Sequence, residues 1–329
     1  MASDEPIFSI VVPCYNGELT LERCLRSLRE HQEGLLEIVL VDDGSTDRSV
    51  AIAEAHGCRV IRHDRNRGSA AARNTGARAA EGEVIIFVDT DVITPPHTLT
   101  RLRTHLDAHP EVDAVNGTYT WAYDQPSRFG RFFNALMYVE MARCPLIIIT
   151  SFCAIRREAF AACEGFDERI DSAYADDITF GWVFKNRGLT SAQFPDIECT
   201  HLKTLSFREW VRHSYKHGRY WTESFFKNID ETSQLGGEAV TSGFRAWNIA
   251  LVGAMLPAAA VPLLTAPVIP VLGAAFLINN RLVLQTFLER EGVRFAAFGA
   301  AALAGESVCY LAGAGLGVIA APRNLLRRP

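Results

Sequence analysis

Asp89-Thr90-Asp91 is the sequence element with the clearest capacity for chemistry. Its two carboxylates stand at positions i and i+2, directly after the apolar run Glu83–Val88. Such a pair can hold a hard divalent cation, which can then bridge the oxygens of a diphosphate. Because Asp-x-Asp is also common in ordinary loops, the place of this pair in the fold decides its meaning.

A second acidic pair, Asp42-Asp43, follows the apolar run Glu37–Val41. An acidic side chain at that point can accept a hydrogen bond from a base N–H or from a ribose hydroxyl. Carboxylates that meet at one edge of a sheet repel each other unless a cation or a donor group lies between them. The two acidic pairs together therefore suggest a nucleotide diphosphate bound with a metal ion.

The elements that must position these pairs are strands and helices in alternation. Continuous apolar runs are typical of strands covered on both faces, and they occur at Phe8–Pro13, Glu37–Val41 and Glu83–Val88. Helical patterns lie between or after them at Leu19–Glu30, Ser45–His56 and Gly68–Ala80. This order predicts a doubly wound, Rossmann-like α/β sheet with its ligands beyond the carboxyl ends of the strands. We expect a fourth strand through Ala114–Val115 and an irregular, loop-built acceptor half from about Tyr119 to Thr204.

Several common functions are excluded by the sequence. The 33 Lys and Arg against 38 Asp and Glu give a net charge of −5, so a nucleic-acid binder is not expected. No phosphate-binding loop of the G-x-x-x-x-G-K-[ST] type and no G-x-G-x-x-G after a strand are present. The eight cysteines form no C-x-x-C pair, which favours reduced thiols that fill the core over a zinc site.

Five motifs occur in the order seen in glycosyltransferase family 2, and the chain resembles that family over roughly residues 7 to 220. The motifs are Val11–Asn16, Val41–Asp47, Asn66–Gly68 with Ala72–Gly76, Phe87–Asp91, and Gly165–Glu168 followed by Asp176-Asp177 and Lys185–Gly188. The resemblance implies a GT-A fold and a nucleotide-activated sugar as donor.

The resemblance also implies roles for individual residues. Those expected to bind the nucleotide sugar are Pro13, Tyr15, Asn16, Asp42, Asp43, Arg73, Asp89 and Thr90, with Arg73 near the diphosphate. Asp91 resembles the principal ligand of a divalent metal, Mn²⁺ or Mg²⁺, and Asp89 a metal or ribose contact. His201 stands where related enzymes sometimes place a further metal ligand, although a lone histidine is more often structural.

The expected catalytic residues are Asp177 and its neighbour Asp176. Asp177 matches the second acid of the family's Glu-Asp pair and is expected to act as general base. The sequence departs from the family here, because Asp176 replaces the glutamate and Thr179 stands where another acid often follows. The Q-x-x-R-W signature of processive synthases is not matched, which favours addition of a single sugar.

This assignment predicts a one-step displacement that inverts the anomeric centre. The metal and Arg73 would stabilise the leaving diphosphate, while Asp177 takes the proton of the acceptor hydroxyl. No residue pattern distinguishes UDP from GDP or dTDP, and the acceptor is equally open.

The last third of the chain has the composition of a membrane region. Ala246–Asn280 is an uncharged stretch of 35 residues, and Phe295–Pro322 has 28 residues with Glu306 as its one charge. Since one span needs about 20 residues, we expect a hairpin of two short helices and a last span, with Glu306 facing protein or water. Leu205–Lys227 mixes aromatic and basic residues, typical of an interfacial helix or of an amphipathic helix packed on the domain.

The sequence as a whole predicts a GT-A catalytic domain at 1–236, including an interfacial helix at 205–230, and then transmembrane helices. A linker at 237–246, a transmembrane region of two or three segments at 247–322 and a basic tail at 323–329 complete the chain. The expected protein is a multi-pass glycosyltransferase of a bacterial inner membrane. It would move sugar from a nucleotide-sugar donor to a lipid or lipid-linked acceptor at the cytoplasmic face. A polyprenyl-phosphate glycosyltransferase and a non-catalytic GT-A-like membrane scaffold are the alternatives.

Overall fold

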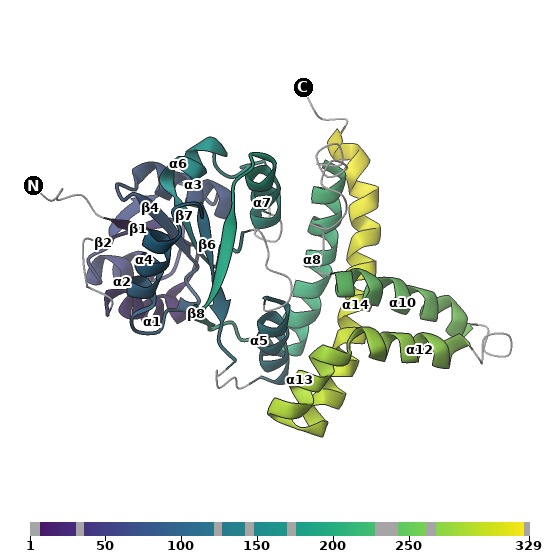
Figure 1. Cartoon of the computed structure of the whole chain (residues 1–329). Coiled ribbons are helices and arrows are strands. Elements are labelled where there is room, and N and C mark those ends of the chain that lie inside the picture. The colour runs from purple at the N-terminus through teal and green to yellow at the C-terminus, as the bar shows by residue number, and fades with distance from the viewer. Residues whose placement is uncertain are drawn as a thin grey trace, which may run out of the picture. The chain divides into compact units, whose positions relative to one another are not determined.

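The computed structural model describes residues 7–30, 36–121, 127–141, 148–169, 176–227, 243–260 and 268–325 (Figure 1). The chain divides into two compact units. The first unit combines Met1–Tyr123 with Pro145–Lys203, and the second combines Asp124–Cys144 with Thr204–Pro329. Most of the expected linker at 237–246 and most of the expected basic tail at 323–329 lie outside the described residues.

The first unit is built on a mixed sheet of eight strands in the order β3-β2-β1-β4-β7-β6-β8-β5. The strands are β1 (Phe8–Cys14), β2 (Leu36–Asp42), β3 (Arg59–Arg62), β4 (Val84–Val88), β5 (Val92–Ile93), β6 (Ala114–Tyr119), β7 (Phe152–Arg156) and β8 (Ser191–His201). The pairings of β1 with β2 and β4, and of β2 with β3, are parallel, whereas β7 is antiparallel to β4 and β6. The parallel half confirms the doubly wound arrangement, and β6 confirms the fourth strand expected at Ala114–Val115.

Helices of the first unit pack against this sheet. They are α1 (Glu18–Arg29), α2 (Ser49–Ala55), α3 (Ser69–Ala79), α4 (Thr98–Ala108), α6 (Arg157–Ala162) and α7 (Asp176–Asn186). Helix α3 lies directly on β1, because a Cβ at Gly76 would collide with the side chain of Val11. Small residues along α3, including Ala72 and Ala77, are buried against the sheet. This close approach fixes where the polar residues of α3 stand relative to the ends of the strands.

The expectation of an irregular segment from Tyr119 to Thr204 is wrong. That segment contains strands β7 and β8 and helices α6 and α7, besides α5 (Arg128–Met141) of the second unit. The pattern hid β8 because its burial alternates between exposed and buried residues and Pro195 interrupts it, so it has no continuous apolar run. Strand β7 is buried but only five residues long.

The second unit is helical and comprises α5, α8 (Phe207–Lys227), α10 (Gly243–Ala260), α12 (Val268–Asn279), α13 (Arg281–Glu291) and α14 (Val293–Leu325). Helices α8 and α14 lie side by side along much of their lengths (Figure 1). Gly305 faces Trp210, Gly218 faces the backbone of Tyr310, and Gly313 faces the backbone between Tyr215 and Arg219. These contacts advance in the same direction along both helices, so α8 and α14 are parallel and their backbones approach closely.

One helix of the described residues is long and apolar enough to cross a bilayer, at Val293–Leu316. The pair Pro270–Asn279 and Arg281–Glu291 passes the same test only as one segment bent by 67°. The expected two or three spans, and hence a multi-pass protein, are therefore not supported by these residues. Glu306 is buried within the second unit, as expected for a carboxylate in so apolar a helix.

Candidate active site

The predicted site residues gather beyond the carboxyl ends of β1, β2 and β4. Cys14 at the end of β1 pairs with Asp42 at the end of β2, and the amide of Asp43 donates to the Cys14 carbonyl at 2.8 Å. Strand β4 flanks β1 on its other side, so Asp89 emerges at the same edge. The sheet therefore brings both acidic pairs to one edge, as the sequence predicts.

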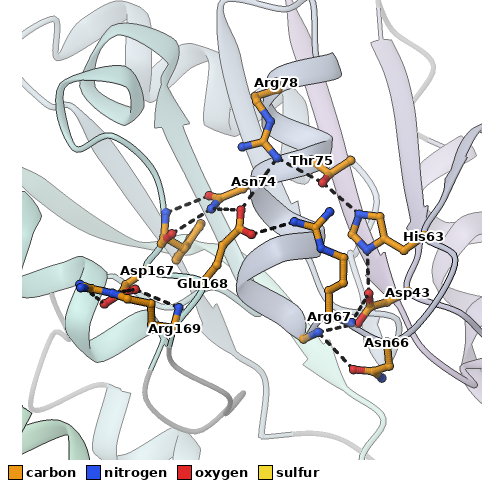
Figure 2. A network of polar contacts seen from close by, with 12 residues as sticks. Asp43, His63, Asn66, Arg67, Asn74, Thr75, Arg78, Asp167, Glu168 and Arg169 are labelled. Carbon is orange, nitrogen blue, oxygen red and sulfur yellow. Dashed lines mark hydrogen bonds and ion pairs between the residues drawn. The ribbon is translucent and has the colours of Figure 1, made fainter. Parts of the chain in front are cut away.

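Asp43 is buried and its carboxylate holds a loop in place (Figure 2). Oδ1 accepts hydrogen bonds from the amide of Arg67 at 2.8 Å and from Nδ1 of His63 at 2.7 Å. Oδ2 accepts one from the amide of Gly68 at 2.8 Å. Gly68 has a φ of +91°, a conformation that suits glycine, and α3 begins at the next residue. Asp43 thus fixes the entrance to α3.

Asp42 and Asn16 hold the neighbouring turn. Asp42 is fully buried, and its carboxylate accepts from the amide of Ser45 at 3.0 Å and from Nε of Arg62 at 3.2 Å. Asn16 has a positive φ of 52°, donates its amide to Oγ of Ser45 and accepts from the amide of Thr46, both at 2.9 Å.

Pro13 and Tyr15, the remaining predicted base contacts, stand at the end of β1. Pro13 is the half-buried penultimate residue of the strand. The ring of Tyr15 lies just past the strand end and is 53% exposed. An exposed aromatic ring beside buried carboxylates is suited to contact a flat ligand such as a nucleobase.

Arg73 joins two acids that are far apart in the sequence. Its guanidinium donates from Nη1 to Oδ2 of Asp176 at 2.5 Å and from Nη2 to Oδ1 of Asp89 at 2.8 Å. Arg73 is 3% exposed, and the ring centroid of Phe166 lies 5.8 Å from its guanidinium carbon. Burial alone would lower the pKa of Arg73, but the attraction of Asp176 and Asp89 outweighs it and raises that pKa. The sequence places Arg73 near a diphosphate, whereas the structure shows it between two carboxylates.

The two acids at the start of α7 have different surroundings. Asp176 is 2% exposed and accepts from Arg73 and, at 2.6 Å, from the hydroxyl of Ser69. Its Oδ1 accepts the backbone amide of Asp177 at 2.9 Å. Asp177 is half-buried. The more open of the two acids is therefore the one that the sequence assigns as general base.

Asp91 lies beside His201, with 3.3 Å between Oδ2 and the imidazole Nε2. The short ladder of β5 with β8 pairs Val92 with His201, and the ring of Tyr119 stacks on the imidazole at 5.2 Å. Burial alone would raise the pKa of Asp91, but the attraction of His201 outweighs it and lowers that pKa to about 2. Burial raises the pKa of Asp89, against the opposing effect of Arg73. Thr90 lies half-buried between these two acids, in van der Waals reach of Gly17.

The donor set fits a divalent cation that shares its coordination with a ligand. No group of three or more His, Cys, Asp or Glu side chains within the described ranges is arranged to enclose a metal ion. Asp91 and His201 nevertheless offer an oxygen and a nitrogen donor side by side, with Asp89 two residues away along the chain. One or two carboxylates plus substrate phosphates and water are a sufficient set for Mg²⁺, and imidazole is also a ligand for transition metals.

Comparison with known proteins identifies the family of the first unit, which contains the sheet. The family model for glycosyl transferase family 2 matches residues 9–163. The chain carries a family 2 glycosyltransferase domain.

Relatives and solved structures agree with this identification. The chain is 33% identical over 150 residues to the succinoglycan biosynthesis protein ExoO of Rhizobium meliloti. This alignment covers 45% of the chain and 42% of ExoO. It is 40% identical over 105 residues to the undecaprenyl-phosphate 4-deoxy-4-formamido-L-arabinose transferase of Pseudomonas paraeruginosa, covering 29% and 31%. The alignments span well under half the length of the curated relatives that the chain matches.

The fold extends beyond the residues that the family model matches. The mannosyltransferase PcManGT from Pyrobaculum calidifontis, solved in complex with GDP-Man and Mn²⁺, superimposes with a TM-score of 0.56 at 20% identity. The superposition covers 98% of this chain and 88% of that one, which shows a GT-A fold. Asp176, Asp177 and His201 lie beyond residue 163 but within the same sheet unit of the family 2 domain.

Sequence reasoning missed a second polar network in the first unit, centred on Glu168 (Figure 2). Its carboxylate accepts from Nη2 of Arg67 at 2.9 Å and from Nδ2 of Asn74 at 3.0 Å. Asn74 also exchanges hydrogen bonds with the backbone of Phe166, both at 2.8 Å. Gly165 has a φ of +83°, and a Cβ there would clash with Asn74. These residues belong to motifs that the sequence shows, but it does not show that the motifs contact each other.

Proposed function

We propose that this chain is an inverting, metal-dependent glycosyltransferase whose donor is a nucleotide-diphosphate sugar. The observation that carries the proposal is the meeting of Asp91 and His201 with the Asp89–Arg73–Asp176 cluster and the half-buried Asp177 in one unit. Asp91 and His201 would hold the divalent cation, with Asp89 as a further contact. The solved complex of PcManGT with GDP-Man and Mn²⁺ supports this choice of donor and metal.

The residues of the chain divide the chemistry between them. A bound divalent cation supplies Lewis-acid stabilisation of the departing diphosphate. Asp177 takes the proton of the acceptor hydroxyl as that oxygen attacks the anomeric carbon. Arg73 holds Asp89 and Asp176 in fixed positions, since it donates to both. Tyr15, with Pro13 and Asn16 beside it, would contact the nucleobase, and a single displacement would invert the anomeric centre.

We further propose that the acceptor is a lipid or a lipid-linked sugar and that the protein works at the cytoplasmic face of a membrane. The apolar helix Val293–Leu316 supports this, as do exposed apolar side chains of the second unit. Trp247, Val271, Ile278 and Val293 are each at least 60% exposed. Side chains of this kind are stable against lipid and costly in water. One relative is named as an undecaprenyl-phosphate sugar transferase, and undecaprenyl phosphate is a lipid carrier.

That same relative favours a second candidate, a polyprenyl-phosphate glycosyltransferase. The phosphate of such an acceptor is already ionised and needs no base. Asp177 would then contribute little to the rate. The product would also differ, because a sugar linked through phosphate to a lipid is more acid-labile than an ordinary glycolipid.

The variant Asp177→Asn tests the proposed function. We expect donor binding to be retained and sugar transfer to fall by more than about a hundredfold, the effect typical of a lost general base. Transfer is measured with a panel of nucleotide sugars, with and without Mn²⁺, to neutral lipid and polyprenyl-phosphate acceptors. The exposed Asp196→Asn is the matched control, because it changes a carboxylate on the same unit away from the site. Undiminished transfer by Asp177→Asn would remove the base role and favour the polyprenyl-phosphate acceptor.

A further inference from the structure

A chain of hydrogen bonds runs from the surface to Asp43 through residues to which the proposed mechanism gives no role. Nη2 of Arg78 donates to Oγ1 of Thr75 at 3.3 Å, and Oγ1 of Thr75 lies 3.0 Å from Nε2 of His63. Nδ1 of the same imidazole lies 2.7 Å from Oδ1 of Asp43. Figure 2 shows these four side chains in line between α3 and the end of β2.

The groups at the two ends of the chain fix the direction of the end bonds. Arg78 has no acceptor, so it can only donate to Thr75. The carboxylate of Asp43 accepts, so Nδ1 of His63 carries a proton and donates it to Asp43. The hydroxyl of Thr75 can both donate and accept, so it can pair with Nε2 of His63 in either direction. The contact with Asp43 therefore fixes a proton on Nδ1 of His63.

His63 stands where its orientation has an effect on Asp43. Its side chain is 6% exposed, and its backbone amide donates to the carbonyl of Asp42 at 2.8 Å, which ties it to the end of β2. Asp43 accepts three hydrogen bonds, two of them from the amides of Arg67 and Gly68. The bond from His63 is the one that comes from a side chain. It adds to the two amide bonds that orient the carboxylate holding the loop before α3.

We propose that His63 is a positioning residue for the nucleoside diphosphate part of the donor. It orients Asp43, and Asp43 holds the Asn66–Gly68 loop and the first turn of α3 at the edge where the nucleotide binds. This inference rests on the proposed function, since it assigns His63 to the donor side of that site. Asp91 and Asp177 lie on other elements, so loss of His63 should weaken donor binding more than the chemical step.

Two substitutions separate a positioning role from simple filling of space. His63→Phe keeps an aromatic ring but has no ring nitrogen, whereas the side-chain amide of His63→Asn can still donate to Asp43. We expect His63→Phe to raise the donor KM and the Kd for nucleotide about tenfold, with kcat changed less than about threefold. His63→Asn should recover most of the affinity. Equal affinity in His63→Phe and the wild type, or a fall in kcat alone, would overturn the proposal.

A spectroscopic measurement tests the hydrogen-bond chain itself. In protein with ¹⁵N-labelled histidine, the bond to Asp43 predicts a protonated Nδ1 for His63. Thr75→Val removes the hydroxyl and should change the signal of Nε2, whereas Thr75→Ser should retain the wild-type signals. An unprotonated Nδ1 in the wild type would overturn the proposed chain, because Asp43 would then lack its side-chain donor.

Binding of the probe nucleotides distinguishes this inference from the function on which it rests. UDP, GDP and dTDP are titrated calorimetrically with Mn²⁺ into the wild type, His63→Phe and His63→Asn. If the wild type binds none of them, the proposed function is wrong and the donor role of His63 is wrong with it. If the wild type binds one of them and His63→Phe binds it equally well, only the inference about His63 is overturned.

Discussion

Two acidic pairs meet at the same edge of the sheet, and their carboxylates are satisfied in different ways. Asp42 ends β2 and Asp43 follows it, and backbone amides of Ser45, Arg67 and Gly68 supply much of the hydrogen bonding of this pair. Asp89 and Asp91 follow β4, and they pair with the side chains of Arg73 and His201, respectively. The β2 pair is buried, whereas the side chains of Asp89 and Asp91 are 32% and 28% exposed.

We propose that this difference separates a supporting role from a reactive one. A backbone amide can leave its carboxylate only if the loop that carries it moves, so the β2 pair stabilises the shape of the site. A side-chain partner can rotate and give its place to a ligand at a much smaller cost in free energy. The β4 pair is therefore the one able to exchange its present partners for a cation or a sugar nucleotide.

The largest expected effect comes from the β4 pair. Asp91→Asn should lower kcat/KM by about a thousandfold, roughly 4 kcal/mol, because the expected principal metal ligand loses its charge. Metal-dependent nucleotide binding, followed by calorimetry with and without Mn²⁺, should be lost as well. Asp107→Asn, an exposed carboxylate on α4, is the control and should behave as the wild type. Retention of Mn²⁺-dependent binding in Asp91→Asn would contradict the assignment.

The next effect comes from the side chain that joins the β4 pair to α7. Arg73→Met should lower the free energy of unfolding by about 3–5 kcal/mol, because Asp176 would stay buried without its cation. Urea denaturation measures the loss. The double variant Arg73→Met with Asp176→Asn should be more stable than Arg73→Met alone, since it removes the unpaired charge. No recovery in the double variant would show that Asp176 is not the source of the loss.

A smaller effect is expected at the β2 pair. Asp43→Asn should lower the free energy of unfolding by about 1–3 kcal/mol, because one carboxylate oxygen becomes an amide that cannot accept from Arg67 or Gly68. The loss should appear in urea denaturation of ligand-free protein. The exposed Asp64→Asn serves as the matched control. An unchanged midpoint in Asp43→Asn would mean that the loop does not depend on this carboxylate.

The smallest effect concerns Asp47, which lies between the end of β2 and the start of α2. Burial alone would raise its pKa, but the hydroxyl of Ser49 and the amides of Glu18 and Ser49 donate to it and lower that pKa. A carboxylate with a depressed pKa stabilises the fold above its unfolded pKa of about 3.9, and the stabilisation is lost as the pH falls through the folded value. Asp47→Asn should therefore flatten the loss of stability below about pH 4. An equal fall in the melting temperature of variant and wild type between pH 5 and pH 3 would contradict this.

The sequence predicts the parallel half of the sheet because β1, β2 and β4 are continuous apolar runs followed by polar clusters. It also predicts that Asp42, Asp43, Asp89 and Asp91 share an edge, since parallel strands end together. It does not predict which of the site's side chains form hydrogen bonds or ion pairs with each other. Arg73 and Asp176 are 103 positions apart, and no spacing rule relates a helix after β3 to a helix after β7.

The contacts of His63 and Glu168 were hidden for a similar reason. Each residue stands in a polar stretch of the chain, and its partners are brought close by the packing of α3 on β1. The helices of the second unit were predictable as helices from composition. The number of membrane spans was not, because proline and apolar content do not show where a helix bends.

The close approach of α8 and α14 bears on how this protein can be handled. Removing the chain from Val293 onward would delete the apolar segment and, with it, the surface that covers α8. Trp210, which Gly305 contacts, and Ser214 are almost fully buried in the intact chain. A shortened protein made to avoid detergent would expose the face of α8 that α14 covers, and it would self-associate through that face. Purification should therefore keep both helices and supply a lipid-like environment instead.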